Sequence, residues 1–365
     1  MLTASIPPTP QYATTLSAPT PYPELLPLPL PTMPSPSDLD SLRPFLNPAY
    51  LTSKILTLLR TQFIEQSHLV LADFLHPSIA TELEGLIRAR DAEMEKGPRR
   101  GMMVNGQKVD RIPPHTAGED AETGWQVVGP PHLQRYLALS PSAPPSSVDA
   151  EADRLSTLLR QIHSLFTSPA FASLLASLTS LLPTAYTTSI RRFRPGLDYT
   201  LARGETASDP DAQAKLDVGL GLTPRCEEEK DREVWEAGEA GGWDIWLANE
   251  EGGDEATYGG GGSGGDKKAT ENGKGAEEEE AEKAAATAAA AEQEQQGEGE
   301  EEDDDDGPLL ALEPDWNRLH LVLRDPGVLS FVKYVSARAP ASRWDVVGEW
   351  QVQGIEEEED EEEAQ

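Results

Sequence analysis

The six histidines of the chain are the side chains best suited by type to hold a catalytic metal. Non-haem iron is typically bound by a His-x-Asp/Glu pair on one strand and a second histidine far downstream. The residues two positions after these histidines are Val, Ser, Ala, Gln, Leu and Val, so none begins the pattern; the histidines are His68, His76, His115, His132, His163 and His320. The sequence also has no phosphate-binding GxxxxGK[ST], no HExxH and no GxSxG at a strand-to-helix elbow, since we interpret GGGGSGG at 259–265 as a flexible linker. No catalytic signature is therefore recognised.

Cysteine chemistry is equally restricted. Cys226 is the single cysteine of the chain, which excludes an internal disulfide and a site built from several thiolates. The three glutamates that follow, at 227–229, should raise the pKa of its thiol rather than lower it. We interpret Cys226 as a loop residue.

Tryptophans and two basic side chains are the remaining candidates for binding. We expect several of the tryptophans to line a barrel interior, with a peptide-binding groove around Trp235, Trp243 and Trp246 as the alternative. His132 follows two prolines and lies near Arg135. We expect His132 to make a structural hydrogen bond, with a place in a partner-binding surface as the alternative. His320 falls on the polar side of an alternating strand, which predicts a solvated surface histidine.

Net charge limits the classes of partner. The chain carries −34, of which two acidic runs contribute −22: residues 277–306 have 15 acids and one lysine, and residues 356–363 are all acidic. Such a surplus repels phosphate backbones, so direct nucleic-acid binding is disfavoured.

No stretch of the sequence approaches the ~20 apolar residues of a membrane span. The proline-interrupted N-terminus lacks the pattern of a secretory signal, so we expect a cytoplasmic or nuclear protein.

The periodicity of apolar residues changes from helical to strand-like along the chain. Residues 1–43, with eleven prolines among the first 37, are predicted to form a disordered linker. Helical spacing follows in three regions. The first has Leu51, Ile55, Leu58, Leu59 and Phe63, and the second is a segment opened by Pro77. The third has two helices, one around Leu155, Leu158, Leu159, Ile162 and Phe166 and the other over 168–182, started by Ser168-Pro169. From Tyr186 the period is two, as in KLDVGLGLT, RLHLVLR and RWDVVGEWQV.

These elements define the expected architecture. About seven short strands, with helices supplied by the N-terminal half, predict a mainly β fold with flanking α-helices, either a sandwich or a jelly-roll barrel. The ordered domain should span 44–352. Residues 249–307 and 353–365 should be a disordered acidic insert and an acidic tail, because their composition offers little apolar surface to bury.

Eight colinear sequence blocks resemble the C-terminal domain of the prolyl 3,4-dihydroxylase family. The blocks are NPAYL (47–51), VLADFL (70–75), GPPHLQRYL (129–137), LFTSPAFASLLASLTSLL (165–182), RRFRPGLDYTL (191–201), LDVGLGLTP (216–224), WEAGEAGGWDIWLA (235–248) and the segment 321–352. The family consists of oxygenases that use Fe(II), 2-oxoglutarate and ascorbate and hydroxylate a proline of a small-subunit ribosomal protein. The resemblance implies the second of two tandem double-stranded β-helix domains, of the jelly-roll or cupin-like type. This second domain is called the degradation domain in fungi, and it lacks a working metal site.

The resemblance also assigns a vestigial pocket. It places Arg203 at the position of the first histidine ligand, Glu205 at the carboxylate ligand and Val332 at the distal histidine. Arg343 keeps the residue type that pairs with the 2-oxoglutarate carboxylate. Since a guanidinium and an isopropyl group cannot ligate Fe(II), we expect no bound cofactor, and we expect Arg203 and Glu205 to form an ion pair in a metal-free pocket.

The leading functional hypothesis is a non-catalytic domain that binds protein partners, with ribosomal, translation-termination or transcription-factor turnover proteins as the expected classes. Whether the chain has enzymatic activity stays open, because the first alternative is a truncated part of a full prolyl hydroxylase. The second alternative is an acidic, chaperone-like module whose charged tracts are the functional part.

Overall fold

The computed structural model describes residues 18–94, 103–104, 107–108, 124–142, 152–202, 213–248 and 307–354. Nearly all of them belong to one compact unit, which combines the chain up to Asn249 with the chain from Pro308 onward. A second unit, Glu250–Gly307, contains only Gly307 among the described residues. The predicted acidic insert and tail therefore lie outside the described residues, apart from the ends of these ranges.

Two antiparallel sheets form the centre of the compact unit. The large sheet has the order β2-β12-β9-β14-β7-β6-β5, with β1 on β7 and β8 on β6; the bounds are β1 (Thr20–Pro21), β2 (His68–Leu71), β5 (Trp125–Val128), β6 (Gln134–Leu139), β7 (Leu181–Phe193), β8 (Tyr199–Thr200), β9 (Lys215–Leu222), β12 (Trp316–Arg324) and β14 (Arg343–Gly354). The small sheet has the order β11-β10-β13, with bounds Leu310–Leu312, Asp244–Ala248 and Val328–Val332. A separate hairpin joins β3 (Met103–Val104) and β4 (Gln107–Lys108).

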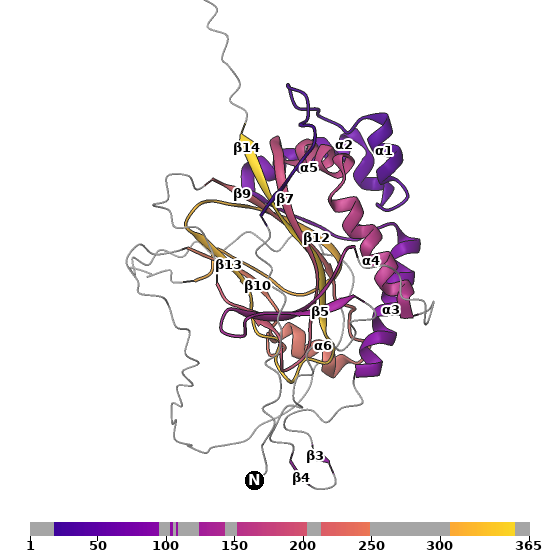
Figure 1. Ribbon diagram of the computed structural model, residues 1–365, viewed down its shortest axis with the longest axis vertical. Helices are drawn as coiled ribbons and strands as arrows, with labels where there is room; N and C mark the ends of the chain where they lie inside the picture. Colours follow the sequence, from indigo (N-terminus) through magenta and orange to yellow (C-terminus); the bar gives the residue numbers. More distant parts are fainter. Residues whose placement is uncertain are drawn as a thin grey trace, which may run out of the picture. The chain divides into compact units, whose positions relative to one another are not determined.

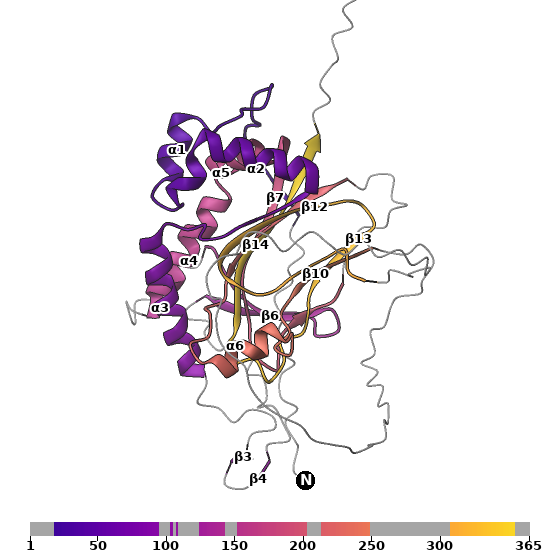
Figure 2. The same cartoon turned by 180° about the vertical axis from the view of Figure 1, so that it is seen from behind.

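The chain alternates between the two sheets, which confirms the predicted double-stranded β-helix. From β7 in the large sheet it passes to β8, where Thr200 Oγ1 accepts a hydrogen bond from the Val332 amide of β13 at 2.7 Å. It then runs through β9 (large), β10 and β11 (small), β12 (large), β13 (small) and β14 (large). Figures 1 and 2 show β10 and β13 on one side of the large sheet and α1 to α5 on the other.

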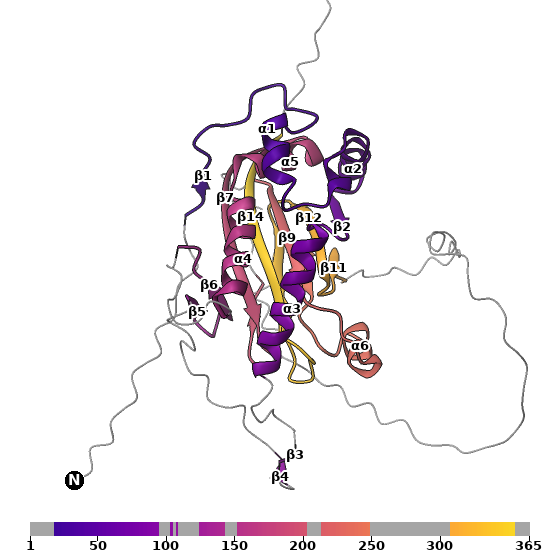
Figure 3. The same ribbon diagram turned by 90° about the vertical axis from the view of Figure 1, so that its right-hand side faces the viewer.

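Five helices cover the other face of the large sheet, and Figure 3 shows α3 and α4 in front of its strands. Their bounds are α1 (Pro36–Leu42), α2 (Ser53–Gln66), α3 (Pro77–Met94), α4 (Ala152–Phe166) and α5 (Pro169–Thr179); α6 (Glu229–Glu236) precedes β10, and a 3-10 turn, η1, spans Pro48–Leu51. The main core lies between these helices and the sheet. The predicted alternation is confirmed there, because Leu216, Val218, Leu220 and Leu222 of β9 are all buried.

Helix α5 shows how local chemistry sets an element. Ser168 caps its N-terminus by accepting a hydrogen bond from the Phe171 amide at 3.2 Å, and Pro169 occupies the first turn, as predicted. The helix ends at Thr179 because Ser180 adopts a left-handed conformation with φ 60°. Strand β7 therefore begins at Leu181, earlier than the prediction that continued the helix to residue 182.

The face of α2 differs from the expected one. Leu58 was predicted to point inward but is 62% exposed, whereas Leu56 is fully buried. The reason is that Leu51 belongs to the preceding 3-10 turn, so it is not in phase with the helix that begins at Ser53. Leu51 and Phe63 are buried as expected.

The ordered fold begins well before residue 44, so the prediction of a disordered linker up to residue 43 was wrong for residues 18–43. Strand β1 pairs with β7, and Ser35 forms a capping box with Asp38 at the start of α1. Tyr22 is 7% exposed, and its hydroxyl accepts a hydrogen bond from Trp350 Nε1 at 3.0 Å. The proline content of the segment gave no sign of this tertiary contact.

Among the described residues, no helix has the length and apolar character of a membrane span.

Candidate functional site

The two faces of the large sheet differ in chemistry. On β9, the leucines that face the helices alternate with Asp217, Gly219 and Gly221, which face the small sheet. On β14, Asp345 and Glu349 likewise make ion pairs on the face opposite to Trp344 and Trp350, which belong to the helix-side core. The space between the two sheets is therefore lined largely by polar groups, and the candidate site lies there.

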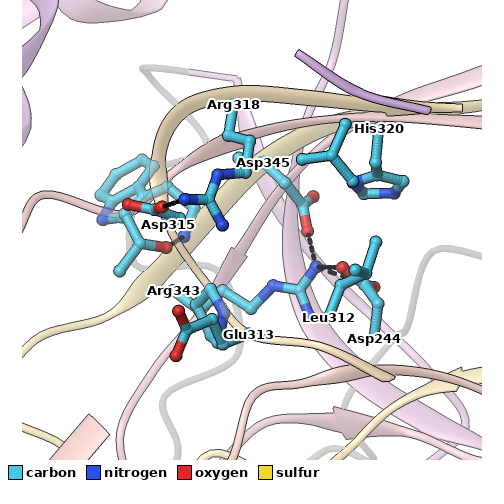
Figure 4. A pocket seen from close by; sticks show the side chains of 13 residues that line it. Asp244, Leu312, Glu313, Asp315, Arg318, His320, Arg343 and Asp345 are labelled. Atoms are coloured by element: carbon cyan, nitrogen blue, oxygen red, sulfur yellow. Dashed lines mark hydrogen bonds and ion pairs between the residues drawn. The ribbon is translucent and has the colours of Figure 1, made fainter. Parts of the chain in front are cut away.

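Arg343 stands at the first position of β14 and is only 3% exposed. Its Nη2 donates to both carboxylate oxygens of Asp244, at 2.9 and 2.8 Å, and to Oδ2 of Asp345 at 2.7 Å (Figure 4). Its Nη1 donates to the Gly242 carbonyl at 2.5 Å. Asp244 belongs to the small sheet and Asp345 to the large one, so this guanidinium connects the two sheets through ion pairs.

Arg191 of β7 extends the network. Its Nε and Nη2 donate to the two oxygens of Asp345 at 2.8 and 2.9 Å, the bidentate geometry that suits a guanidinium and a carboxylate. The guanidinium carbon lies 5.0 Å from the centre of the Phe193 ring. Two arginines and two aspartates thus form one neutral cluster, which we call the Arg343 network: Arg191, Asp244, Arg343 and Asp345.

The net effect of the cluster on Asp244 is a lowered pKa. Burial raises the pKa of this carboxyl, but the charges of Arg343, His320 and Arg191 and the hydrogen bond from Arg343 outweigh the burial and hold the pKa below its usual value. Asp244 is therefore ionised at neutral pH, and it acts as the counter-ion of the Arg343 fork.

Val332, the residue at the predicted distal-ligand position, lies next to this network. In the register of the small sheet it is opposite Asp244. Its side chain is 2% exposed and belongs to a second, smaller apolar cluster with Phe193 and Trp235. The structure thus brings Val332 and Arg343 together through Asp244. Arg203 and Glu205 lie outside the described residues, so their predicted ion pair stays a prediction.

A second charged cluster lies further along the same face. Asp217 accepts hydrogen bonds from Arg324 Nε at 2.8 Å and from Trp246 Nε1 at 3.0 Å. Glu349 pairs with Arg324 and, at 3.0 Å, with Lys215. Burial raises the pKa of the Asp217 carboxyl, and the hydrogen bonds and the Arg324 charge act against that rise. Since Trp246 is on β10, this cluster also connects the small sheet to the large one.

His320 corrects the expectation of a solvated surface histidine. It lies half-buried on β12 with its ring edge-on to Trp246, at 5.8 Å between ring centres. A Cβ on Gly219, the residue opposite in the register, would come within 2.3 Å of the imidazole, so glycine leaves the space that the ring occupies. Burial lowers the pKa of His320. The strand alternation was right, but the polar face is covered by the small sheet.

The tryptophans proposed as partner anchors are mostly core residues. Trp235 and Trp246 are 8% and 4% exposed, whereas Trp243 is half-buried. Trp246 lines the space between the sheets, as expected for a barrel interior, but Trp344 and Trp350 pack on the helix side.

Burial contributes most to the raised pKa of the Cys226 thiol, ahead of the charge of the neighbouring Asp231.

His132 and Arg135 lie at the turn before and the start of β6. His132 is exposed, and within the described part of the chain its ring makes no hydrogen bond, so the expected structural bond is not present. Arg135 Nε lies 3.7 Å from Oδ1 of the buried Asp198. A role of either residue in partner binding stays a prediction.

A cavity of about 880 Å³ lies between the sheets. Most of its lining comes from β5, β6, β7, β9, β12 and β14 of the large sheet and from β10 and β13 of the small one, and His163 of α4 also contributes. The Arg343 network contributes Arg191 and Asp244, and the second cluster contributes all of its members. A much smaller pocket of about 20 Å³ adjoins Arg343, Asp345 and His320.

The described residues do not fit Fe(II) and 2-oxoglutarate. The guanidinium that would bind a carboxylate of 2-oxoglutarate already holds two protein carboxylates, and Val332 offers no ligand atom. In the part of the chain that the structure describes, no group of three His, Cys, Asp or Glu side chains is placed to hold a metal ion. Asp244 and Asp345 were missed by sequence reasoning. The Arg-x-Asp spacing at 343–345, which puts both side chains on one face of a strand, was the available signal.

The alternation of the chain between two antiparallel sheets defines a double-stranded β-helix. The model of the family described as "Oxoglutarate and iron-dependent oxygenase degradation C-term" matches residues 37–360, and the chain belongs to this family. A relative, the prolyl 3,4-dihydroxylase OGFOD1 of Ostreococcus tauri, is 26% identical over 317 residues. The match covers 86% of this chain and 48% of the relative, so the chain spans about half the length of that protein.

Two solved structures were also matched. One is a prolyl hydroxylase from Trichoplax adhaerens in complex with a hypoxia inducible factor peptide, with 12% identity, a TM-score of 0.34 and coverage of 81% of this chain and 88% of that chain. The other is a Pseudomonas putida prolyl-4-hydroxylase, with 12% identity, a TM-score of 0.32 and coverage of 81% and 98%.

Proposed function

We propose that this chain is a non-catalytic, protein-binding regulatory domain of a prolyl dihydroxylase-like oxygenase. The observation that carries the proposal is the double occupation of the Arg343 fork by Asp244 and Asp345. A 2-oxoglutarate carboxylate would have to displace a charge-assisted pair that is already held by the fold. Because both aspartates are covalently part of the chain, they compete at a high effective concentration.

The test is direct binding of the co-substrate. We expect isothermal titration of the full chain with Fe(II) and 2-oxoglutarate to show no stoichiometric binding and no release of succinate. A matched variant, Arg343→Gln, should show the same lack of binding and turnover, because the guanidinium of Arg343 in the wild-type chain is already bound to Asp244 and Asp345. Stoichiometric binding of Fe(II) with turnover of 2-oxoglutarate by the wild-type chain would refute the proposal.

Partner capture is the second part of the proposal. The expected partners are ribosomal, translation-termination or transcription-factor turnover proteins in the cytoplasm or nucleus. Affinity purification with the full chain, followed by mass spectrometry, should recover them, and recovery should persist when 249–307 and 353–365 are removed. Loss of binding on that deletion would favour an acidic, chaperone-like module instead.

A second candidate is that the chain is part of a longer prolyl hydroxylase. The observation that favours it is the coverage of only 48% of the length of the dihydroxylase relative. On this reading the same domain would regulate a catalytic domain in the same polypeptide. Genomic sequence upstream of codon 1 that encodes an in-frame His-x-Asp and distal histidine would support it.

A further inference from the structure

The cavity between the two sheets has a definite chemistry that the vestigial cofactor pocket does not account for. Its floor, from the large sheet, includes Thr187, Ser189 and Gln351. Its wall, from the small sheet, includes the apolar side chains of Trp246 and Val332, which the alternation of β10 and β13 turns toward the large sheet. The three floor side chains are half-buried, so they are accessible to a ligand in the cavity. We call this cavity the intersheet groove.

Each charged side chain that lines the groove already has an oppositely charged partner. Lys215 pairs with Glu349 at 3.0 Å, and Arg324 pairs with Asp217 at 2.8 Å. Arg191 pairs with Asp345 at 2.8 Å, and Asp244 pairs with Arg343 at 2.8 Å. A charged ligand would therefore find no free counter-ion, and displacing a partner would leave an uncompensated buried charge.

The groove also differs from a site for a purely apolar ligand. Hydroxyl and amide groups on its floor need hydrogen-bond partners when a ligand excludes water. Apolar side chains on its wall gain from contact with apolar groups of a ligand. The volume of about 880 Å³ is in the range of roughly 300–1,000 Å³ found for ligand sites. An extended peptide offers backbone amides and apolar side chains in alternation and so matches both surfaces.

We propose that the intersheet groove binds an extended, uncharged segment of a partner protein. This inference rests on the proposed protein-binding function and names the surface and the chemistry of the partner. The charge pairing of the groove selects against acidic and basic segments. Its floor hydrogen-bonds the backbone of the segment, while Trp246 and Val332 contact its apolar side chains.

The experiment is selection of random 12-residue peptides, displayed on phage, against the full chain. We expect the enriched peptides to lack Asp, Glu, Lys and Arg, with affinities then measured by fluorescence polarisation of the synthetic peptides. Ser189→Arg on the large sheet and Ser330→Arg on the small sheet should each weaken binding at least tenfold, because both serines line the groove. Leu58→Arg, at a position that is 62% exposed on α2, is the matched control and should leave the affinity unchanged.

Two groove variants from different sheets keep the test meaningful if one of them fails to fold. Enrichment of charged peptides, absence of any enriched peptide, or affinities that neither groove variant changes would overturn the inference. Self-association of the chain through the groove, seen by light scattering and lost in the variants, would also overturn it. None of these outcomes implies turnover of 2-oxoglutarate, so the groove can fail while the non-catalytic assignment stands.

Discussion

Asp345→Asn tests whether the Arg343 network holds the two sheets together. Asp345 is 2% exposed and accepts hydrogen bonds from Arg191 at 2.8 and 2.9 Å and from Arg343 at 2.7 Å. The asparagine keeps the side-chain shape but removes the charge, which leaves two guanidinium groups against the single carboxylate of Asp244. Breaking a buried pair in this way typically costs about 3–5 kcal/mol. For a folded unit of this size that corresponds to a melting temperature lower by about 6–20 °C.

Urea unfolding followed by circular dichroism measures the change. The matched control is Glu239→Gln, which removes an exposed ion pair with Arg338 whose side chains are 50% and 75% exposed. The control should lose less than about 1 kcal/mol, because water and salt screen exposed pairs. If Asp345→Asn were no more destabilising than Glu239→Gln, the Arg343 network would not be holding the two sheets together. The reasoning that Asp244 and Asp345 occupy the Arg343 guanidinium would then be refuted.

Three further predictions use the same unfolding assay. Gly219→Ala should destabilise by about 1–3 kcal/mol, since its Cβ would clash with the His320 ring at 2.3 Å, whereas Gly85→Ala in α3, with nothing within 4 Å, should stabilise by about 0.5–1 kcal/mol; equal effects would contradict the packing. Burial lowers the folded-state pKa of His163 and His320, so the unfolded chain takes up protons first as pH falls through about 6.5. Stability should therefore fall from pH 7 to 5, and a flat profile would argue against burial of these rings. Tyr22→Phe should cost about 1–3 kcal/mol because an indole donor loses its acceptor; no change would place the N-terminal strand outside the cooperative fold.

Much of the fold could be predicted because local signals determined it. The period-two pattern identified β9 and β14, and Ser168-Pro169 identified the start of α5. Propensity could not predict that Tyr22, in a proline-rich stretch, accepts a hydrogen bond from the indole of Trp350, because those residues are 328 positions apart. The phase of α2 was missed for a similar reason, since a 3-10 turn interrupts the helical period before it.

The candidate site was predicted only in part. The sequence by itself determined that the six histidines lack the iron-binding spacing. The places of Arg343 and Val332 in a cofactor pocket are what the family resemblance implies, and they stay predictions. Only the tertiary structure decided what Arg343 binds, because Asp244 lies 99 residues away on the other sheet. It also decided that His320 is covered. Alternation along a strand specifies which residues share a face, but burial depends on which distant segment packs against that face.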